Sequence, residues 1–446
     1  MAPGALLTDL YELNMAASYL RRDMRQEATF SLFVRNLPRE RGFLVAAGLE
    51  PALEALAAFH FAPEDLAYLR GLGFEEDVLA AFAELRFAGD VWAVPEGRIV
   101  FANEPLLELT APMPVAQLVE PFLLNLLTFQ TTIASKAARC AIAAGGRDLV
   151  DFALRRTQGL DAALAVARVT AMVGFGATSN VEAARRYGLT AAGTMAHSYI
   201  ESFPTEIEAF RTFALDRPGN ATFLVDTYDV HQGVRNAIAV IRELGLTEHL
   251  GIRLDSGDLA TLARDARAML DDADLPHVRI VASGGLDEHD VARLVADGAP
   301  IDTFGVGTRI GVSADAPTLD SAYKLVEFDG GPVVKLSAEK ASYPGRKQVF
   351  RSDTGDVLGL RDEAPPSGAA PLLVAAMHRG ERVGGSATLP DGRTRFEADL
   401  RALPADARRL EAPVAPRASI SPALAALTDR ARADARRRAG LPAASP

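Results

Sequence analysis

Arginine and aspartate side chains occur together at the ends of apolar segments in the middle of the sequence. Arg253 and Asp255 lie two residues apart in GIRLDSGDL, so both point to the same side of one predicted strand. The arginine can bind an anionic ligand while the carboxylate holds hydroxyl groups or a magnesium ion. The two can equally form a structural ion pair, and Asp258 can serve only as the cap of the next helix.

Two glycine-containing segments follow the last two predicted strands. Gly284 and Gly285 lie in SGGLDEHD, and Gly305, Gly307 and Thr308 lie in FGVGTRIG. Glycine lets backbone N–H groups approach a phosphate closely, and the N-terminus of a following helix adds positive charge. Either segment alone can be no more than a turn. Their position after the last strands of a βα array favours a phosphate site.

His197, in GTMAHS, is the histidine that stands at the end of a predicted strand. Asp226, in LVDTYD, ends the next predicted strand and can hydrogen-bond one nitrogen of the His197 ring, which would fix its tautomer. A histidine of this kind can act in catalysis or can be an ordinary hydrogen-bonded polar residue. The residue types alone leave both roles open.

These residues follow short β-branched segments that alternate with helix-like patterns. The predicted strands comprise residues 148–154, 189–194, 221–227, 250–255, 278–283 and 301–305, with a shorter one at 173–176. Helical spacing marks residues 259–270 and the segment after Asp287, a candidate N-cap, and Thr205 with Glu208 fits a capping box. The alternation predicts a parallel sheet, either closed as a barrel or open and doubly wound.

Both ends of the chain show a different mixture of helices and short strands. Helices are predicted at 51–59, 63–72, 76–82 and 422–440, and strands at 28–34, 89–92, 106–109, 332–336, 345–351 and 371–376. The last helix ends in Arg436, Arg437 and Arg438, which fits a solvated helix C-terminus. We therefore predict an α+β domain in residues 1–120, a barrel-like catalytic domain in 121–330, and a segment in 331–446 that completes the flanking domain.

The composition argues against several classes of function. The chain has 446 residues with 47 lysines and arginines against 58 aspartates and glutamates, and this net charge of −11 disfavours a broad nucleic-acid-binding face. A single cysteine, Cys140, excludes an internal disulfide and favours a reducing compartment. No apolar segment approaches the roughly 20 residues that span a membrane, and no secretory signal is visible. We therefore expect a cytoplasmic protein.

Ordered motifs along most of the chain carry a resemblance to a known family. They are LLTDLYELNM, FSLFVRNLPRERGFLVAAGLE, NLLTFQTTIASKAAR, DFALRRTQG, GFGATSNV, GTMAHSYIESF, LVDTYDVHQGV, GIRLDSGDL, VRIVASGGLDE, FGVGTRI and KLSAEKASYPGRKQVFR. With them the chain resembles the nicotinate phosphoribosyltransferases. The resemblance implies an α/β fold like that of type II phosphoribosyltransferases. In this fold an irregular (β/α) barrel of parallel strands is joined by a flanking α+β domain built from both chain ends.

The resemblance also implies a reaction. Family members convert nicotinate and phosphoribosyl pyrophosphate to nicotinate mononucleotide and pyrophosphate in NAD salvage, coupled to ATP hydrolysis through a phosphohistidine. Magnesium as cofactor, ATP as co-substrate and a homodimer with shared active sites are implied in turn. Because these substrates are anions and the chain is acidic, a local basic cluster helped by magnesium must bind them.

The functional residues of the family match named positions of this sequence. The catalytic positions are His197 as the phosphorylated histidine, Asp226 as its acidic partner and Asp255 as a carboxylate near the ribose. The pyridine contacts match Phe152, Arg155, Thr194 and Arg253, with Tyr11 contributed by the partner subunit. The phosphate loops match Gly284, Gly285, Gly305, Gly307 and Thr308, and the candidate pyrophosphate contacts are Arg35, Arg41, Lys340, Arg346 and Lys347.

Ser179, in GATSNV, bears on the choice of substrate. Relatives that use nicotinamide carry an aspartate at this position, which accepts a hydrogen bond from the amide and repels a carboxylate. A serine can donate to a carboxylate instead, so it favours nicotinate. Ala153 departs from the family pattern, in which a glycine usually follows the aromatic residue.

Four alternatives remain beside this function. A nicotinamide-specific relative is disfavoured by Ser179, and a quinolinate-type transferase is shorter and lacks the segment with the phosphorylated histidine. A lyase or isomerase of a phosphosugar would present a Schiff-base lysine or paired proton-transfer groups, whereas these strand ends present arginines. A non-enzymatic binding protein would be expected to lack His197, Arg253 or Asp255, and all three are present.

Overall fold

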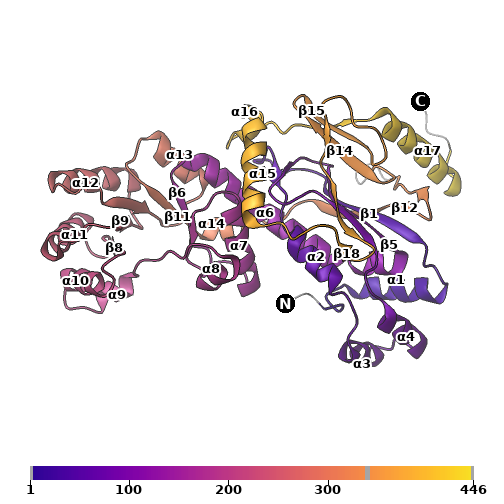
Figure 1. The fold of residues 1–446 in the computed structure, drawn as a ribbon, viewed down its shortest axis with the longest axis horizontal. Helices are drawn as coiled ribbons and strands as arrows, with labels where there is room; N and C mark the ends of the chain where they lie inside the picture. Colours follow the sequence, from indigo (N-terminus) through magenta and orange to yellow (C-terminus); the bar gives the residue numbers. More distant parts are fainter. Residues whose placement is uncertain (1–3, 337–341, 443–446) are drawn as a thin grey trace. The chain divides into compact units, whose positions relative to one another are not determined.

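The computed structural model describes residues 4–336 and 342–442 (Figure 1). The chain divides into two compact units, the first made of Met1–Ser135 with Thr318–Pro446 and the second of Lys136–Pro317. Both chain ends thus build one unit, as the predicted fold class requires. The predicted domain boundaries at residues 120 and 330 stay predictions.

The second unit is built on a six-stranded sheet in the order β7-β6-β11-β10-β9-β8, with every pair parallel. The strands are β6 (Asp148–Asp151), β7 (Ala177–Thr178), β8 (Ala221–Leu224), β9 (Leu250–Leu254), β10 (Arg279–Ala282) and β11 (Thr303–Val306). The sheet is curled into a half-barrel, which confirms the predicted irregular barrel of parallel strands. Strands β6, β8, β9 and β10 end one to three residues before their predicted ends, whereas β11 runs one residue beyond its predicted end.

Two predicted strands of the second unit are wrong. Residues 173–176 form the turn that ends a helix, with Gly174 at a φ of +114°, and the strand β7 begins only after this turn. Residues 189–194 contribute an isolated parallel bridge from Ala191 to Thr178. The small residues of this segment offer little side-chain surface to a sheet.

Helices alternate with the strands of this curled sheet along the chain. They are α7 (Leu160–Met172), α8 (Val181–Tyr187), α9 (His197–Glu201), α10 (Glu206–Asp216), α11 (Val230–Leu244), α12 (Leu259–Asp272), α13 (Glu288–Ala296) and α14 (Thr308–Gly311). The predicted caps of α10, α12 and α13 are confirmed at Thr205, Asp258 and Asp287, whose side chains accept backbone N–H groups of the first helical turn. Helix α6 (Glu120–Ala144) contains the boundary between the units, and its last residues belong to the second.

The first unit is an α+β structure around a seven-stranded antiparallel sheet, in the order β13-β12-β1-β5-β3-β17-β18. These strands are β1 (Glu27–Val34), β3 (Asp90–Ala93), β5 (Pro105–Pro112), β12 (Ser321–Phe328), β13 (Gly331–Pro332), β17 (Val374–His378) and β18 (Glu381–Arg382). A second sheet joins β16 (Ala370–Pro371), β14 (Lys347–Ser352), β15 (Gly355–Leu360) and β19 (Ser419–Ile420), and a separate pair joins β2 (Leu44–Val45) and β4 (Ile99–Val100).

The helices of the first unit come from both chain ends. They are α1 (Leu10–Arg21), α2 (Leu49–Ala57), α3 (Pro63–Gly71), α4 (Glu76–Glu84), α5 (Met113–Leu118), α15 (Leu389–Ala402), α16 (Ala405–Arg408) and α17 (Pro422–Arg438). The four helices predicted in the flanks are confirmed as α2, α3, α4 and α17. No helix in the part of the chain that the structure describes is long and apolar enough to cross a membrane.

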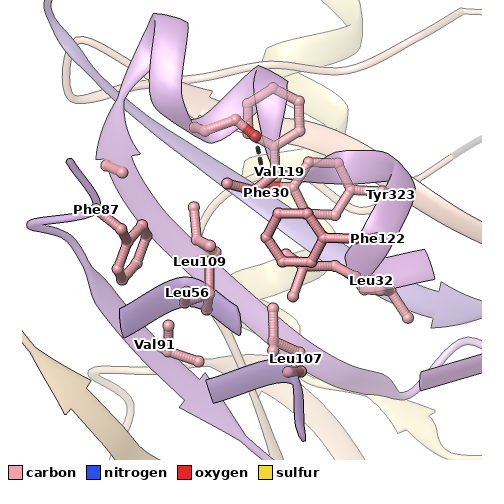
Figure 2. Packing of buried hydrophobic residues seen from close by; sticks show 14 of the residues in the cluster. Phe30, Leu32, Leu56, Phe87, Val91, Leu107, Leu109, Val119, Phe122 and Tyr323 are labelled. Atoms are coloured by element: carbon pink, nitrogen blue, oxygen red, sulfur yellow. Dashed lines mark hydrogen bonds between the residues drawn. The ribbon is translucent and has the colours of Figure 1, made fainter. Parts of the chain in front are cut away.

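Aromatic and aliphatic side chains fill the core of the first unit, as Figure 2 shows. The rings of Phe30 on β1 and Tyr323 on β12 stack with their centroids 4.6 Å apart, and the Tyr323 hydroxyl donates to the carbonyl of Ala116 at 2.8 Å. Removing such surfaces from water, at about 25 cal/mol per Å², is the main stabilising contribution. This core therefore holds the two ends of the chain together.

The first unit corrects two predicted strands. The segment 371–376 is divided between β16, which ends at Pro371, and β17, which begins at Val374 and belongs to the other sheet. Of the predicted segment 332–336 only Pro332 belongs to a strand, where it pairs at the sheet edge with β12. Proline has no N–H group with which to extend the ladder, so this edge strand is short. Strand β12 itself has eight residues and was not predicted.

Candidate active site

A cavity of about 640 Å³ opens at the carboxyl ends of the parallel strands in the second unit. Ligands of parallel βα sheets bind at this edge, because the loops that follow the strands converge there. The predicted site residues that line this cavity are Phe152, Arg155, Ser179, Thr194, His197, Arg253, Asp255, Gly284, Gly285, Gly305, Gly307 and Thr308. The structure thus brings together residues from six separate segments of the chain.

The guanidinium of Arg253 joins several of these segments. It donates to the hydroxyl of Ser283 at 2.8 Å, to the carboxylate of Asp255 at 2.6 Å and to the hydroxyl of Thr194 at 3.4 Å. Its Cζ lies 5.3 Å from the centroid of the Phe152 ring, within the range of a cation–π contact. The side chain is 15% exposed, so the charge is held in place yet open to the cavity.

The Asp255 carboxylate is ionised beside Arg253. Burial raises the pKa of this carboxyl, but the hydrogen bond from Ser283 and the positive charge of Arg253 lower it more, so the pKa lies below its ordinary value of 3.8. Ser283 donates a very short hydrogen bond to the same carboxylate. An ionised carboxylate at this edge can accept hydroxyl groups of a sugar or hold a cation.

His197 is the first residue of α9, and its Nδ1 lies 3.1 Å from the hydroxyl oxygen of Thr227. The predicted hydrogen bond from His197 to Asp226 is wrong. One oxygen of the Asp226 carboxylate accepts from the N–H of Asp255 at 2.9 Å and from the hydroxyl of Ser256 at 2.7 Å. These two donors bind the Asp226 carboxylate to the loop after β9, while the His197 ring bonds Thr227.

The loop that carries Phe152 is fixed by a buried carboxylate. Asp151 accepts from the N–H of Ala153 at 2.8 Å and from the hydroxyl of Thr178 at 2.7 Å, and its carbonyl accepts from the N–H of Ser179 at 2.8 Å. Burial raises the pKa of Asp151 above its ordinary value, although the hydrogen bond from Thr178 lowers it in part. Asp151 thereby sets the positions of Phe152 and Ser179 relative to each other.

Three glycines of the two predicted phosphate loops, Gly284, Gly305 and Gly307, lie too close to other loops to carry a side chain, whereas Gly285 has open space around it. A Cβ atom on Gly305 would lie 2.5 Å from the Phe152 ring, and one on Gly307 would lie 2.7 Å from the Phe152 carbonyl oxygen. Gly284 has a φ of +105°, and a Cβ there would overlap the carbonyl of Asp255. The backbone of both loops is therefore open to the cavity at the point where they pack together.

The remaining predicted contacts belong to the first unit. Tyr11 lies on α1 with 52% of its surface exposed. The Arg35 guanidinium pairs with the Asp320 carboxylate at 2.8 Å. Arg346 lies 3.4 Å from the Glu327 carboxylate, with its side chain 46% exposed. The roles of Tyr11, Arg35 and Arg346 stay predictions.

Two further pyrophosphate candidates are buried in the first unit, and a third lies outside the described residues. The Lys347 ammonium pairs with the Glu108 carboxylate at 3.0 Å and donates to two backbone carbonyls, so the prediction that it binds pyrophosphate is wrong. Arg41 is buried and donates to the carbonyl of Thr132 at 2.8 Å. Lys340 falls in the segment 337–341, which the structure does not describe.

Sequence reasoning assigned no role to two side chains that organise the cavity. Ser283 bridges Arg253 and Asp255, and Thr227 bonds the imidazole of His197. Thr227 and Ser283 are the last residues of the predicted strands 221–227 and 278–283, next to Asp226 and Gly284. Their position at the ends of predicted strands therefore indicated that they lie near the site. A hydroxyl group alone, however, does not indicate a specific role.

A curled parallel sheet with arginines and glycine loops at its carboxyl edge defines an enzyme class that binds phosphorylated ligands. The family models of the nicotinate phosphoribosyltransferase N-terminal domain and of the nicotinate phosphoribosyltransferase family match residues 6–128 and 148–354. The chain belongs to the nicotinate phosphoribosyltransferase family.

Individual relatives agree with the family models. The chain is 48% identical over 416 residues to the nicotinate phosphoribosyltransferase pncB2 of Mycobacterium tuberculosis, covering 92% of this chain and 89% of the relative. It is 43% identical over 376 residues to the Bacillus subtilis nicotinate phosphoribosyltransferase, covering 80% and 76%. The crystal structure of human nicotinic acid phosphoribosyltransferase superposes with a TM-score of 0.86 at 29% identity, covering 95% of this chain and 99% of that one.

Proposed function

We propose that this protein transfers the phosphoribosyl group of phosphoribosyl pyrophosphate to the ring nitrogen of nicotinate. A bond forms between that nitrogen and C1 of the ribose while the bond from C1 to the pyrophosphate oxygen breaks. The pyrophosphate leaves with the electron pair, and the product is nicotinate mononucleotide. The observation that carries this proposal is the meeting of Arg253, Phe152 and the two glycine loops in one cavity.

The cavity offers complementary groups to both parts of the product. Arg253 and Ser179 can donate to the carboxylate of a pyridine acid, beside the flat surface of Phe152. The loops with Gly284 and Gly305 can direct backbone N–H groups at a phosphate. Binding both parts in one cavity orients the ring nitrogen toward C1, which replaces an encounter in solution.

The transfer itself requires no general base, because the pyridine nitrogen already carries a free lone pair. Positive charge develops on the ribose as the bond to pyrophosphate breaks, and the Asp255 carboxylate is ionised to stabilise it. His197 is thus free for a separate phosphoryl transfer from ATP, with its Nδ1 held by Thr227. Phosphorylation of His197 would couple ATP hydrolysis to the forward reaction.

Magnesium fits the carboxylates at this edge of the cavity. Proteins hold this ion through one or two carboxylates together with substrate phosphates. Asp255 lines the cavity, and Oδ1 of the neighbouring Asp226 is buried without a hydrogen-bond partner among the described residues. Asp255 and Asp226 would hold the ion, and when bound it would neutralise charge on the pyrophosphate. No cluster of three or more metal-ligating side chains occurs within the described ranges.

The test is an assay with separate substrates. The protein is incubated with phosphoribosyl pyrophosphate, magnesium and ATP together with nicotinate, nicotinamide or quinolinate, and the products are identified by mass spectrometry. We expect nicotinate mononucleotide as the main product. When nicotinate and nicotinamide compete, nicotinate should be converted preferentially. Preferred formation of nicotinamide mononucleotide would contradict the role of Ser179, and absence of any mononucleotide would refute the proposed function.

A further inference from the structure

The two glycine loops of the cavity, which follow β10 and β11, are connected by contacts beyond the pairing of these strands. Strands β10 and β11 pair only at Val281 with Thr303 and at Ala282 with Phe304, so the ladder stops before the glycines. Beyond this point the spacing of the loops depends on their packing and on side-chain contacts. Ion pairs join the segments that directly follow the two loops.

The outer connection is an ion pair between Asp287 and Arg309. Asp287 follows the SGGL segment and caps α13, where its Oδ1 accepts from the N–H groups of His289 and Asp290. Its other oxygen accepts from the guanidinium of Arg309, which directly follows Thr308. Burial raises the pKa of Asp287, but the backbone hydrogen bond from Asp290 and the contact with Arg309 lower it more, so the carboxyl is ionised.

The inner connection, between the same two segments, is buried. The Lys136 ammonium is 2.6 Å from the Glu288 carboxylate on α13 and 3.0 Å from the Asp315 carboxylate, which follows α14. Arg139 on α6 also contacts Glu288, at 2.9 Å. Lys136 and Glu288 are at most 2% exposed, so removing either would leave a buried charge unpaired and would endanger folding.

We propose that the Asp287–Arg309 pair is a positioning pair that sets the separation of the two glycine loops for one phosphate group. This inference rests on the proposed function. Arg309 does not line the cavity, and its guanidinium pairs with Asp287 and lies 3.5 Å from the carboxylate of Asp290. The backbone N–H groups of the loops therefore bind the phosphate, and Arg309 acts on it through Asp287.

The experiment measures three quantities in four proteins. Ribose 5-phosphate binding is measured by calorimetry, and KM values for phosphoribosyl pyrophosphate and nicotinate are measured in the product assay. The variants are Arg309→Gln, Asp287→Asn and the double variant, compared with the unaltered protein. Asparagine keeps the cap of α13, so Asp287→Asn removes only the charge. Circular dichroism and thermal unfolding establish that each variant is folded.

Each single variant should weaken ribose 5-phosphate binding and raise the KM for phosphoribosyl pyrophosphate by about tenfold, since this corresponds to the loss of one charged contact. The KM for nicotinate should change less than about twofold, because the pyridine contacts lie on other loops. The double variant should be no worse than either single one. Arg309→Lys should restore part of the binding.

The matched control is Arg279→Gln. Arg279 pairs with Asp148 at 2.5 Å and joins the starts of β10 and β6, at the opposite edge of the same sheet. It is an exposed ion pair between strands that lies away from the cavity. Its loss should leave ribose 5-phosphate binding and both KM values unchanged.

Three results would overturn the inference. If Arg309 contacted the phosphate directly, Asp287→Asn would release the guanidinium and strengthen binding instead of weakening it. Equal effects on both KM values would indicate general damage to the cavity. Failure of the unaltered protein to bind ribose 5-phosphate would show that the two loops do not form a phosphate site. A protein that binds ribose 5-phosphate but makes no mononucleotide would refute the proposed function, while the binding comparison would still decide the role of Arg309.

Discussion

Arg253 has hydrogen bonds to three loops of the second unit, through Thr194, Asp255 and Ser283. A lysine could not reproduce this arrangement, because it lacks the planar fork of donors. The guanidinium also faces the Phe152 ring, so one side chain sets both the charge and the shape of the pyridine site.

Replacement of Arg253 by alanine should raise the KM for nicotinate and lower kcat/KM by about 10- to 100-fold, the effect expected from losing charged hydrogen bonds. Steady-state kinetics of product formation measures the change. Arg235→Ala on the exposed side of α11 is the matched control and should behave like the unaltered protein. Unchanged kinetics of Arg253→Ala would remove this residue from the site.

His197→Ala should abolish incorporation of label from γ-labelled ATP into the protein, because no other cavity-lining side chain is an imidazole. Thr227→Val removes only the hydrogen bond to Nδ1, so it should slow labelling without abolishing it. Retained labelling of the alanine variant would show that the phosphoryl group goes to another residue.

At the scale of elements, much of the second unit was predictable. Strand β10, for example, contains Ile280 and Val281, and the polar residue Ser283 follows its end, as the sequence pattern indicated. The side-chain contacts were less predictable. Asp226 lies two residues beyond the end of β8, where its direction depends on the loop after β9, and the sequence does not encode that loop locally.

Lys347 illustrates the same limit in the first unit. It occurs in a basic segment, GRKQ, that suggests phosphate binding, yet it pairs with Glu108 on β5, a strand of the other sheet. The partner is 239 residues away in the chain, so only the assembled sheets reveal the pairing. Burial and partner, not residue type, decide whether a lysine is open to a ligand.

The close contact between the loops predicts the effect of a single methyl group. Gly305→Ala should raise the KM for nicotinate, because the new Cβ would displace the Phe152 ring from 2.5 Å away. Overpacking of this kind costs about 1–3 kcal/mol. Gly176→Ala is the control, since its Cβ would meet its nearest neighbour only at 3.9 Å. Equal KM values for both variants would contradict the packing argument.

At the scale of the whole molecule, the first unit should lose stability as pH rises. Burial and the charge of Glu12 raise the pKa of Glu120 from its ordinary value of 4.5 to about 7. Between these values the folded chain keeps a proton that the unfolded chain has released, so raising the pH favours unfolding. The free energy of unfolding should therefore fall from pH 4.5 to about 7, and Glu120→Gln should reduce this slope.

Urea unfolding followed by fluorescence of Trp92, the single tryptophan of the chain, measures this effect within the first unit. Glu54→Gln, on an exposed position of α2, is the control and should keep the slope of the unaltered protein. A slope that Glu120→Gln leaves unchanged would contradict the assignment of this proton.

Tyr11 tests whether subunits share their active sites. Its ring is half exposed on α1, beside Leu7 and Leu10, which are also exposed. If the ring completes the pyridine site of a partner, the active protein should be a dimer by light scattering. Tyr11→Ala should then raise the KM for nicotinate although Arg253 is still present. A fully active monomer would exclude a shared site.

The most direct test of the central claim is a crystal structure with bound nicotinate mononucleotide. We expect the pyridine carboxylate against Arg253, the ring beside Phe152, and the phosphate between the loops of Gly284 and Gly305. A mononucleotide bound outside this cavity, or with its phosphate against Arg253 and its ring in the glycine loops, would contradict the account.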